Sequence, residues 1–229
     1  MALLMATLAA GGAFAQIPLS AGIGGTFTAD AANMSWTSEA KQALIYLDWP
    51  EDIMNMRYVG GGFFAYFDAA YVMASLGLNF YNVTFANRNM QKEMDALKAK
   101  VTRTEFNIGI YGKFPFNVGS IILFPILGAD IKLVLAETLT LDGEKYQYTN
   151  ADDEEANPLS ELSCLWVKTG VGMDIPLGEK MYLRPIFLYG LGFNNKEQND
   201  EEDILNSGTK LGTYVNHGVD IKVALGFKF

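Results

Sequence analysis

The closing stretch of the chain, TYVNHGVDIKVALGFKF at Thr213–Phe229, alternates strictly between two kinds of residue. One face of an extended strand would carry the apolar set Val215, Val219, Ile221, Val223, Leu225, Phe227 and Phe229, together with His217. The other face would carry Asn216, Gly218, Asp220, Lys222, Ala224, Gly226 and Lys228. Alternation with period two predicts a β-strand with one apolar and one polar face.

The same alternation recurs along the chain in eight segments. They are Ile17–Ala29, Tyr58–Asp68, Ala70–Ala86, Thr102–Phe114, Ser120–Glu137, Leu162–Leu177, Met181–Asn194 and Thr213–Phe229. These segments are longer than the strands of most globular proteins and long enough to cross a bilayer, which takes roughly 9–11 residues of tilted strand. The sequence therefore predicts an all-β fold, an eight-stranded antiparallel up-and-down transmembrane β-barrel.

Long polar connections alternate with short turns. The long ones are residues 30–57, 87–101, 138–161 and 195–212, and the short ones are Asp68-Ala69, residues 115–119 and residues 178–180. Transmembrane barrels have short periplasmic turns and long extracellular loops. We expect the four long loops on the outer side, and a short helix in the second one, NRNMQKEMDALKAK, which is built of helix formers.

The N-terminus predicts export. MALLMATLAAGGAFAQ is an apolar run that ends in a small-x-small pattern before Gln16, although it has no basic start. We expect residues 1–15 to be a signal peptide and residues 16–229 a single barrel domain in the bacterial outer membrane. Net charge is −9 with acidic loops, which argues against nucleic-acid binding. Cys164 is the sole cysteine, so no intrachain disulfide forms.

Ionised side chains fall on the face opposite the apolar row. The predicted inward charges are Arg103, Glu105, Lys113, Asp130, Lys132, Lys168, Asp174, Arg184, Asp220 and Lys222. Charge on the lipid face near the midplane would cost about 2–4 kcal/mol per Lys or Arg, so polar-in and apolar-out is the expected arrangement. We interpret these charges as a structural ion-pair network, with an ion or proton path as the alternative.

An apolar patch is also predicted inside, near the short-turn end. It consists of Ile122, Phe124, Ile126, Ile186 and Leu188. Its alternatives are a solute pocket, a packed plug, or an error of strand parity caused by bulges, which we expect at Pro125 and Pro185 because proline cannot donate to the ladder.

The terminal aromatic of HGVDIKVALGFKF, with apolar residues at every second position before it, is similar to the C-terminal signature of bacterial outer-membrane proteins. Nearly the whole mature chain resembles the small eight-stranded barrels typified by outer membrane protein W and by the OmpX and OmpA transmembrane domains. The resemblance is one of pattern. It implies that Phe227 and Phe229 are read by the barrel-insertion machinery, and that a hydrophobic interior pocket and passage of small apolar molecules are to be considered.

No catalytic, cofactor-binding or metal site is expected. His217, the only histidine, lies on the lipid-facing row, and the His-x-Ser spacing of the barrel deacylases is absent. The acidic runs 152–155 and 200–203 lack the alternating ligand spacing and Gly turn of a dedicated calcium loop.

Three functions remain open. The first is a monomeric, narrow channel or binding barrel for small hydrophobic molecules, surrounded by outer-membrane lipid. The second is a surface adhesin or structural protein whose acidic loops bind an extracellular host factor. The third, a soluble lipocalin-like carrier, requires polar residues outside and is disfavoured by the charged rows.

Overall fold

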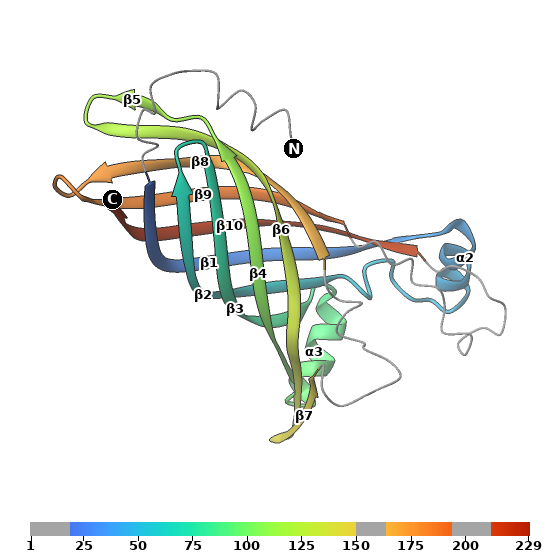
Figure 1. Cartoon of the computed structure of the whole chain (residues 1–229). Helices are drawn as coiled ribbons and strands as arrows, with labels where there is room; N and C mark the ends of the chain where they lie inside the picture. Colours follow the sequence, from blue (N-terminus) through green and yellow to red (C-terminus); the bar gives the residue numbers. More distant parts are fainter. Residues whose placement is uncertain (1–18, 150–163, 194–211) are drawn as a thin grey trace.

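A computed structural model of the chain describes residues 19–149, 164–193 and 212–229. Eight long antiparallel strands form a ring (Figure 1). They are β1 (Leu19–Trp36), β2 (Met56–Ala69), β3 (Val72–Phe85), β4 (Lys100–Lys113), β6 (Ile121–Leu141), β8 (Cys164–Pro176), β9 (Met181–Phe193) and β10 (Gly212–Lys228). Each pairs with the next along the chain, and β1 pairs with β10 to close the ring. The predicted fold class is confirmed.

Short connections lie at one end of the barrel. The β2–β3 turn is at Ala70 and Tyr71, two residues later than predicted, and β8 and β9 are joined across residues 177–180. Between β4 and β6, the three-residue strand β5 (Phe116–Val118) folds back on the start of β6. Gly119 has φ +64° in this hairpin, a conformation that glycine adopts without strain.

The opposite, outer end is more structured than the sequence suggested. The predicted helix in residues 87–101 is present as α3 (Arg88–Ala96). The predicted loop 30–57 is wrong at its start, because β1 continues to Trp36 and is followed by α2 (Ser38–Tyr46). The predicted loop 138–161 likewise begins as β6, which runs to Leu141 and forms a hairpin with β7 (Glu144–Thr149).

The helix α2 has a local sequence signal that was missed. Thr37 is its N-cap, and the Thr37 side chain accepts a hydrogen bond from the Ala40 backbone N–H. Ala40 and Leu44, four residues apart, are buried on the same helix face. The segment was predicted as a polar loop, although Ala43, Leu44 and Ile45 are consecutive apolar residues.

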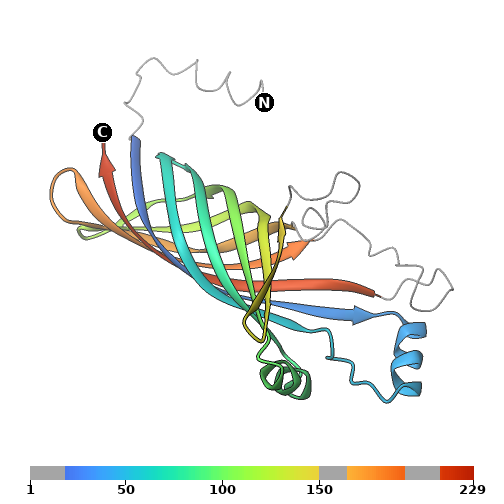
Figure 2. The same ribbon diagram turned by 90° about the horizontal axis from the view of Figure 1, so that it is seen from below.

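The outer end divides into two projections (Figures 1 and 2). The extended β1 and β10 carry α2 away from the barrel on one side, while α3 and the β6–β7 hairpin project together on another. The remaining predicted loop residues, 150–161 and 195–211, and the predicted signal peptide lie outside the described residues.

Side chains alternate between the two sides of the wall as the sequence predicted. Large apolar residues face outward around the ring, among them Ile23, Phe63, Leu76, Ile110, Leu127, Val171, Phe187 and Ile221, each 48% or more exposed. The polar rows face inward and are buried. Neither helix of the described residues is long and apolar enough to cross a membrane.

The expected bulges at Pro125 and Pro185 are absent, which corrects the sequence-based interpretation. Pro125 pairs in register with Val171 of β8. On its other side, the last β4–β6 pair is Lys113 with Ile126, so Pro125 lies beyond this ladder and its lack of an N–H leaves no β4 carbonyl without a donor. At Pro185 the β8–β9 register is the same on both sides, with Met173 and Asp174 left out of the ladder. The register shift that does occur lies between Thr104 and Glu105, where β6 has Leu135 as an extra residue.

Candidate functional site

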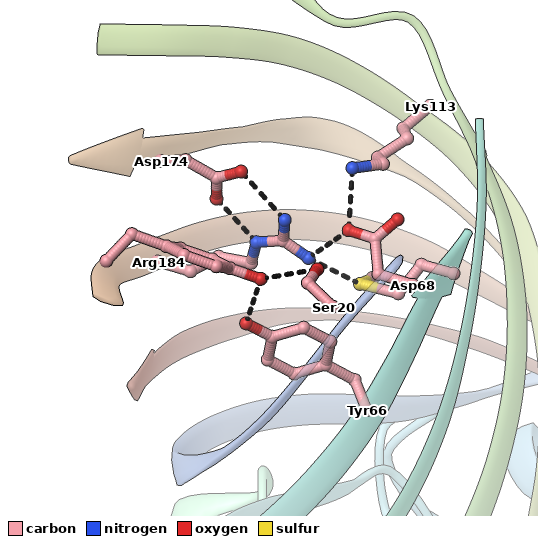
Figure 3. A network of polar contacts seen from close by, with 8 residues as sticks. Ser20, Tyr66, Asp68, Lys113, Asp174 and Arg184 are labelled. Atoms are coloured by element: carbon pink, nitrogen blue, oxygen red, sulfur yellow. Dashed lines mark hydrogen bonds and ion pairs between the residues drawn. The ribbon is translucent and has the colours of Figure 1, made fainter. Parts of the chain in front are cut away.

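Ion pairs and aromatic rings fill the inner end of the lumen, near the short turns (Figure 3). The Arg184 guanidinium binds Asp174 through Nε at 2.6 Å and Nη2 at 2.8 Å, and its Nη1 lies 2.6 Å from Asp68 Oδ2. The same Asp68 oxygen accepts from Lys113 Nζ at 2.6 Å. Two charges of each sign meet here, and we call these four residues the inner-end cluster.

Aromatic hydroxyls and rings enclose this cluster. The Tyr66 hydroxyl donates to the Tyr182 hydroxyl at 2.8 Å, which in turn donates to Ser20 Oγ at 2.7 Å. The Arg184 guanidinium carbon lies 4.6 Å from the Tyr66 ring centroid and 4.9 Å from that of Tyr182. Arg184 is 1% exposed, so this end of the barrel is closed around it.

A second layer of charge crosses the middle of the lumen. Lys168 Nζ bridges two carboxylates, at 2.6 Å from Asp130 Oδ2 and 2.5 Å from Asp220 Oδ2. The Tyr111 hydroxyl donates to Asp130, and Tyr111 is fully buried. Lys222 places Nζ 5.3 Å from the centroid of the Phe64 ring.

A third layer lies toward the outer end. Lys132 forms an ion pair with Asp30, and its Nζ is 4.0 Å from the Trp166 ring centroid. Arg103 donates to Glu137 through Nε at 2.8 Å and approaches Glu105 Oε1 only to 3.8 Å. The structure thus places all ten predicted inward charges inside the wall, in three layers of mixed sign.

The predicted apolar lumen residues come together in one cluster. Phe124, Ile126, Ile186 and Leu188 are each 2% exposed or less and pack with Tyr111 and Met73, while Ile122 is half-buried beside them. Gly172 makes room for this packing, because a Cβ there would lie 2.4 Å from the Phe124 ring. The arrangement is a packed cluster within the barrel rather than an open pocket.

The residues considered as candidate catalytic or metal-binding groups do not form a site. His217 lies on the outer face, where Asn33 Nδ2 is 3.4 Å from its Nδ1. Cys164 is buried inside and its Sγ is 3.7 Å from Asn216 Nδ2. Across residues 19–149, 164–193 and 212–229, no three His, Cys, Asp or Glu side chains are grouped to hold a metal ion. Phe227 lies near the end of β10 and Phe229 directly follows the strand, and both side chains are exposed.

The sequence did not predict two surface features. A groove of about 660 Å³ lies on the outer wall over β1 to β4, lined by Ile23, Phe63, Ala65, Leu76, Leu78 and Phe106 together with backbone glycines. Ala65 is the small outward residue between larger ones, which is the signal that would have indicated it. The groove lies on the same outward side of the wall as the exposed apolar residues of the ring.

The other feature lies where α2 ends. Four large apolar residues are consecutive or nearly so and exposed: Ile45 by 76%, Tyr46 by 90%, Leu47 by 48% and Trp49 by 54%. We call them the α2 patch. Asp48, Glu51 and Asp52 lie beside it in the sequence. A purely polar loop was expected here, and the patch was missed together with the helix.

No family model matches the chain, and no curated protein matches it. Solved structures do match: Neisserial surface protein A has 12% identity and a TM-score of 0.43, covering 90% of this chain and 97% of that one. Ail, the attachment invasion locus protein of Yersinia pestis, has 9% identity and a TM-score of 0.40, covering 92% and 98%.

A major outer membrane protein from Thermus thermophilus has 11% identity and a TM-score of 0.48, covering 90% of this chain and 99% of that one. All three matched proteins are bacterial outer-membrane β-barrels. At such identities the likeness concerns architecture, and the function has to be argued from this chain's own residues.

Proposed function

We propose that this protein is a closed outer-membrane barrel that presents the α2 patch to an extracellular macromolecule, and that it assists no catalytic step. The observation that carries the proposal is a contrast within one chain. Inside, Arg184, Tyr111 and Lys168 are 3% exposed or less, whereas at the outer end Tyr46 is 90% exposed.

A filled lumen is poorly suited to conduction. Three successive layers of ion pairs would each have to be broken to open a path, and separating a buried pair costs several kcal/mol. An eight-stranded barrel also has an interior only about wide enough for its own side chains. The buried ion pairs therefore support a closed, rigid barrel rather than a pore.

The α2 patch has the composition of a protein-binding surface. Tyr and Trp dominate binding energy at interfaces, and contiguous exposed apolar residues on a soluble surface mark interaction sites. Val215, an exposed apolar residue of β10, pairs with Asn33, so the outward apolar row of β1 and β10 ends three residues before Trp36. The α2 patch follows Trp36 in the chain, which favours a partner outside the membrane.

A cell-adherence experiment tests this proposal. Cells that display the protein would be applied to immobilised extracellular-matrix proteins and to cultured host cells, and compared with cells that display the Tyr46→Ser, Trp49→Ser double variant. We expect adherence by the first and a loss of tenfold or more in the second. Tyr146→Ser is the matched control, since Tyr146 is an exposed aromatic on the β7 hairpin, away from α2. Equal adherence by all three would refute the proposal.

A second candidate, binding or passage of a small hydrophobic molecule, is supported by the apolar groove on the outer wall. Planar-bilayer recordings of the refolded protein test it. A closed barrel predicts no stepwise conductance, and no change in the recorded current when apolar solutes are added. Conductance that apolar solutes block would instead establish a channel and refute the closed barrel.

A further inference from the structure

Three basic side chains lie on the outward side of the wall, toward its outer end, and are exposed. They are Arg57 of β2, Lys100 of β4 and Lys145 of β7. Within residues 19–149, 164–193 and 212–229, no side chain forms an ion pair or a ring contact with any of the three. In the lumen, by contrast, Lys132 and Lys168 are paired with carboxylates.

Strand register places the three cations in one row. Arg57 pairs with Thr84 of β3, and Lys100 is opposite Thr84 on its other side when the β3–β4 register is continued by one residue. Lys100 pairs in turn with Thr140 of β6, and Thr140 pairs with Lys145. A cation therefore occupies every second strand, about 9–10 Å from the next, with a threonine between. We call these five residues the basic row.

The acidic side chains of the same projection do not neutralise the basic row. Asp142 pairs with Lys98 at 3.1 Å, and Glu144 accepts a hydrogen bond from the Tyr146 hydroxyl at 2.9 Å. The helix α3 carries two basic and two acidic side chains and adds no net charge (Arg88, Lys92, Glu93 and Asp95). The nearest outward positions along the strands, on the membrane side of the row, are uncharged (Val59, Asn82, Thr102 and Thr138). The row is therefore available to an anion.

The outer-wall groove lies on the same strands as the basic row. Its residues Phe63, Leu78 and Phe106 form one row across β2, β3 and β4, six residues along each strand from the basic row. Six residues of strand span roughly 20 Å, which is about 15 Å of depth at a tilt of about 35–45°. Half of the hydrocarbon core of a bilayer is also about 15 Å thick. The groove and the row are thus separated by the depth of one leaflet of acyl chains.

The outward side chains change from polar to apolar between the row and the groove. On β3 the outward residues, from the outer side inward, are Thr84, Asn82, Phe80, Leu78 and Leu76. The groove itself has a volume of about 660 Å³ and is lined by apolar side chains and glycine backbone. A molecule that lies along this wall would meet cations and hydroxyls first and an apolar groove second, which is the order of a lipid headgroup and its acyl chain.

The two features together select the ligand. Arginine and lysine with nearby hydroxyl donors are the usual partners of phosphate oxygens. A free phosphate would use the row without the groove, and a small apolar solute would use the groove without the row. A phosphorylated lipid uses both.

We propose that this wall binds one phosphorylated lipid of the outer leaflet, with a phosphate between Arg57 and Lys100 and an acyl chain in the groove. Lys145 continues the row toward a second phosphate. The site does not involve the α2 patch, so either proposal stands if the other fails.

Native mass spectrometry of the refolded full chain in nonionic detergent tests the headgroup contact. The probe is bisphosphorylated lipid A, compared with the same lipid after both phosphates are removed. We expect one bound molecule of the phosphorylated form, and a Kd about tenfold or more higher in the Arg57→Gln, Lys100→Gln double variant. Lys41→Gln, Lys180→Gln is the matched control, because it makes the same change in net charge away from the row and should retain the wild-type Kd.

A second pair of variants tests the acyl-chain contact. Ala65→Phe fills the groove and should raise the Kd for the phosphorylated lipid about fivefold or more. Ala74→Phe is its matched control, since Ala74 is an exposed outward alanine of β3 that does not line the groove. Both side chains point away from the lumen, and migration as a folded barrel on a gel verifies each variant before binding is measured.

The outcomes that overturn the proposal are distinct. Equal binding of the phosphorylated and dephosphorylated lipids, or equal Kd values for the double variant and its control, would remove the role of the basic row. Displacement of the lipid by inorganic phosphate, or equal Kd values for Ala65→Phe and Ala74→Phe, would show that the row binds an anion without the groove and would refute a lipid site.

Discussion

The inner and outer ends of this barrel differ in how deeply their ion pairs are buried. At the inner end, Arg184 binds Asp174 with two nitrogens and Asp68 with a third, and aromatic rings cover it. At the outer end, strands separate into two projections, and the Lys98–Asp142 ion pair is 78% and 81% exposed. The chain thus buries ion pairs and aromatic rings in the lumen, and exposes an ion pair and large apolar side chains at the outer end.

The largest effect is expected from breaking the inner-end cluster. Arg184→Leu would leave the Asp68 and Asp174 carboxylates buried with one partner, Lys113, between them. Losing one partner of a buried ion-pair set costs about 3–5 kcal/mol. Urea unfolding of the refolded barrel, followed by tryptophan fluorescence, measures it. A loss below about 1 kcal/mol would show that the cluster does not hold this end together.

The next effect belongs to the outer end and is local. Leu44 is 5% exposed and is one of the two buried residues of α2, so Leu44→Ala should cost about 2–3 kcal/mol of local stability. The expected result is faster protease cleavage near α2 while the barrel still migrates as folded on a gel. Global unfolding by this substitution would contradict the separation of the two ends.

A smaller loss of stability is expected from disturbing the packed apolar cluster, and two glycine-to-alanine variants test it. Gly172→Ala puts a Cβ 2.4 Å from the Phe124 ring and should destabilise by about 1–3 kcal/mol. Gly112→Ala meets one backbone oxygen at 3.6 Å and should leave stability unchanged or slightly raised. Urea midpoints of the two variants decide, and equal midpoints would mean that the lumen has spare room.

The smallest effect is expected at the outer surface. Lys98→Gln removes the exposed ion pair with Asp142, which is worth about 0–1 kcal/mol and is screened by salt. The same urea titration, at low and high salt, should show little change. A loss comparable to that of Arg184→Leu would remove the contrast between the ends.

Much of the fold followed from local pattern. A strand has a side-chain period of two, so Val219, Ile221 and Val223 could be assigned to lipid and Asp220 and Lys222 to the lumen from their order alone. Strand ends were less accurate at the outer side, because pairing with β10 extends β1 beyond its alternating segment, and that pairing is a contact between the two ends of the chain.

The sequence by itself determined the number of strands in the ring, their antiparallel up-and-down order, which face of each carries the apolar row and which ionised side chains turn inward. These follow from alternation and turn placement, which are local. Tertiary structure alone decided that Arg184 meets Asp68 and that Lys168 joins Asp130 to Asp220. It also decided that Arg57, Thr84 and Lys100 line one row. Such partners depend on register and ring closure, which bring residues from distant segments together and are not written in any single strand.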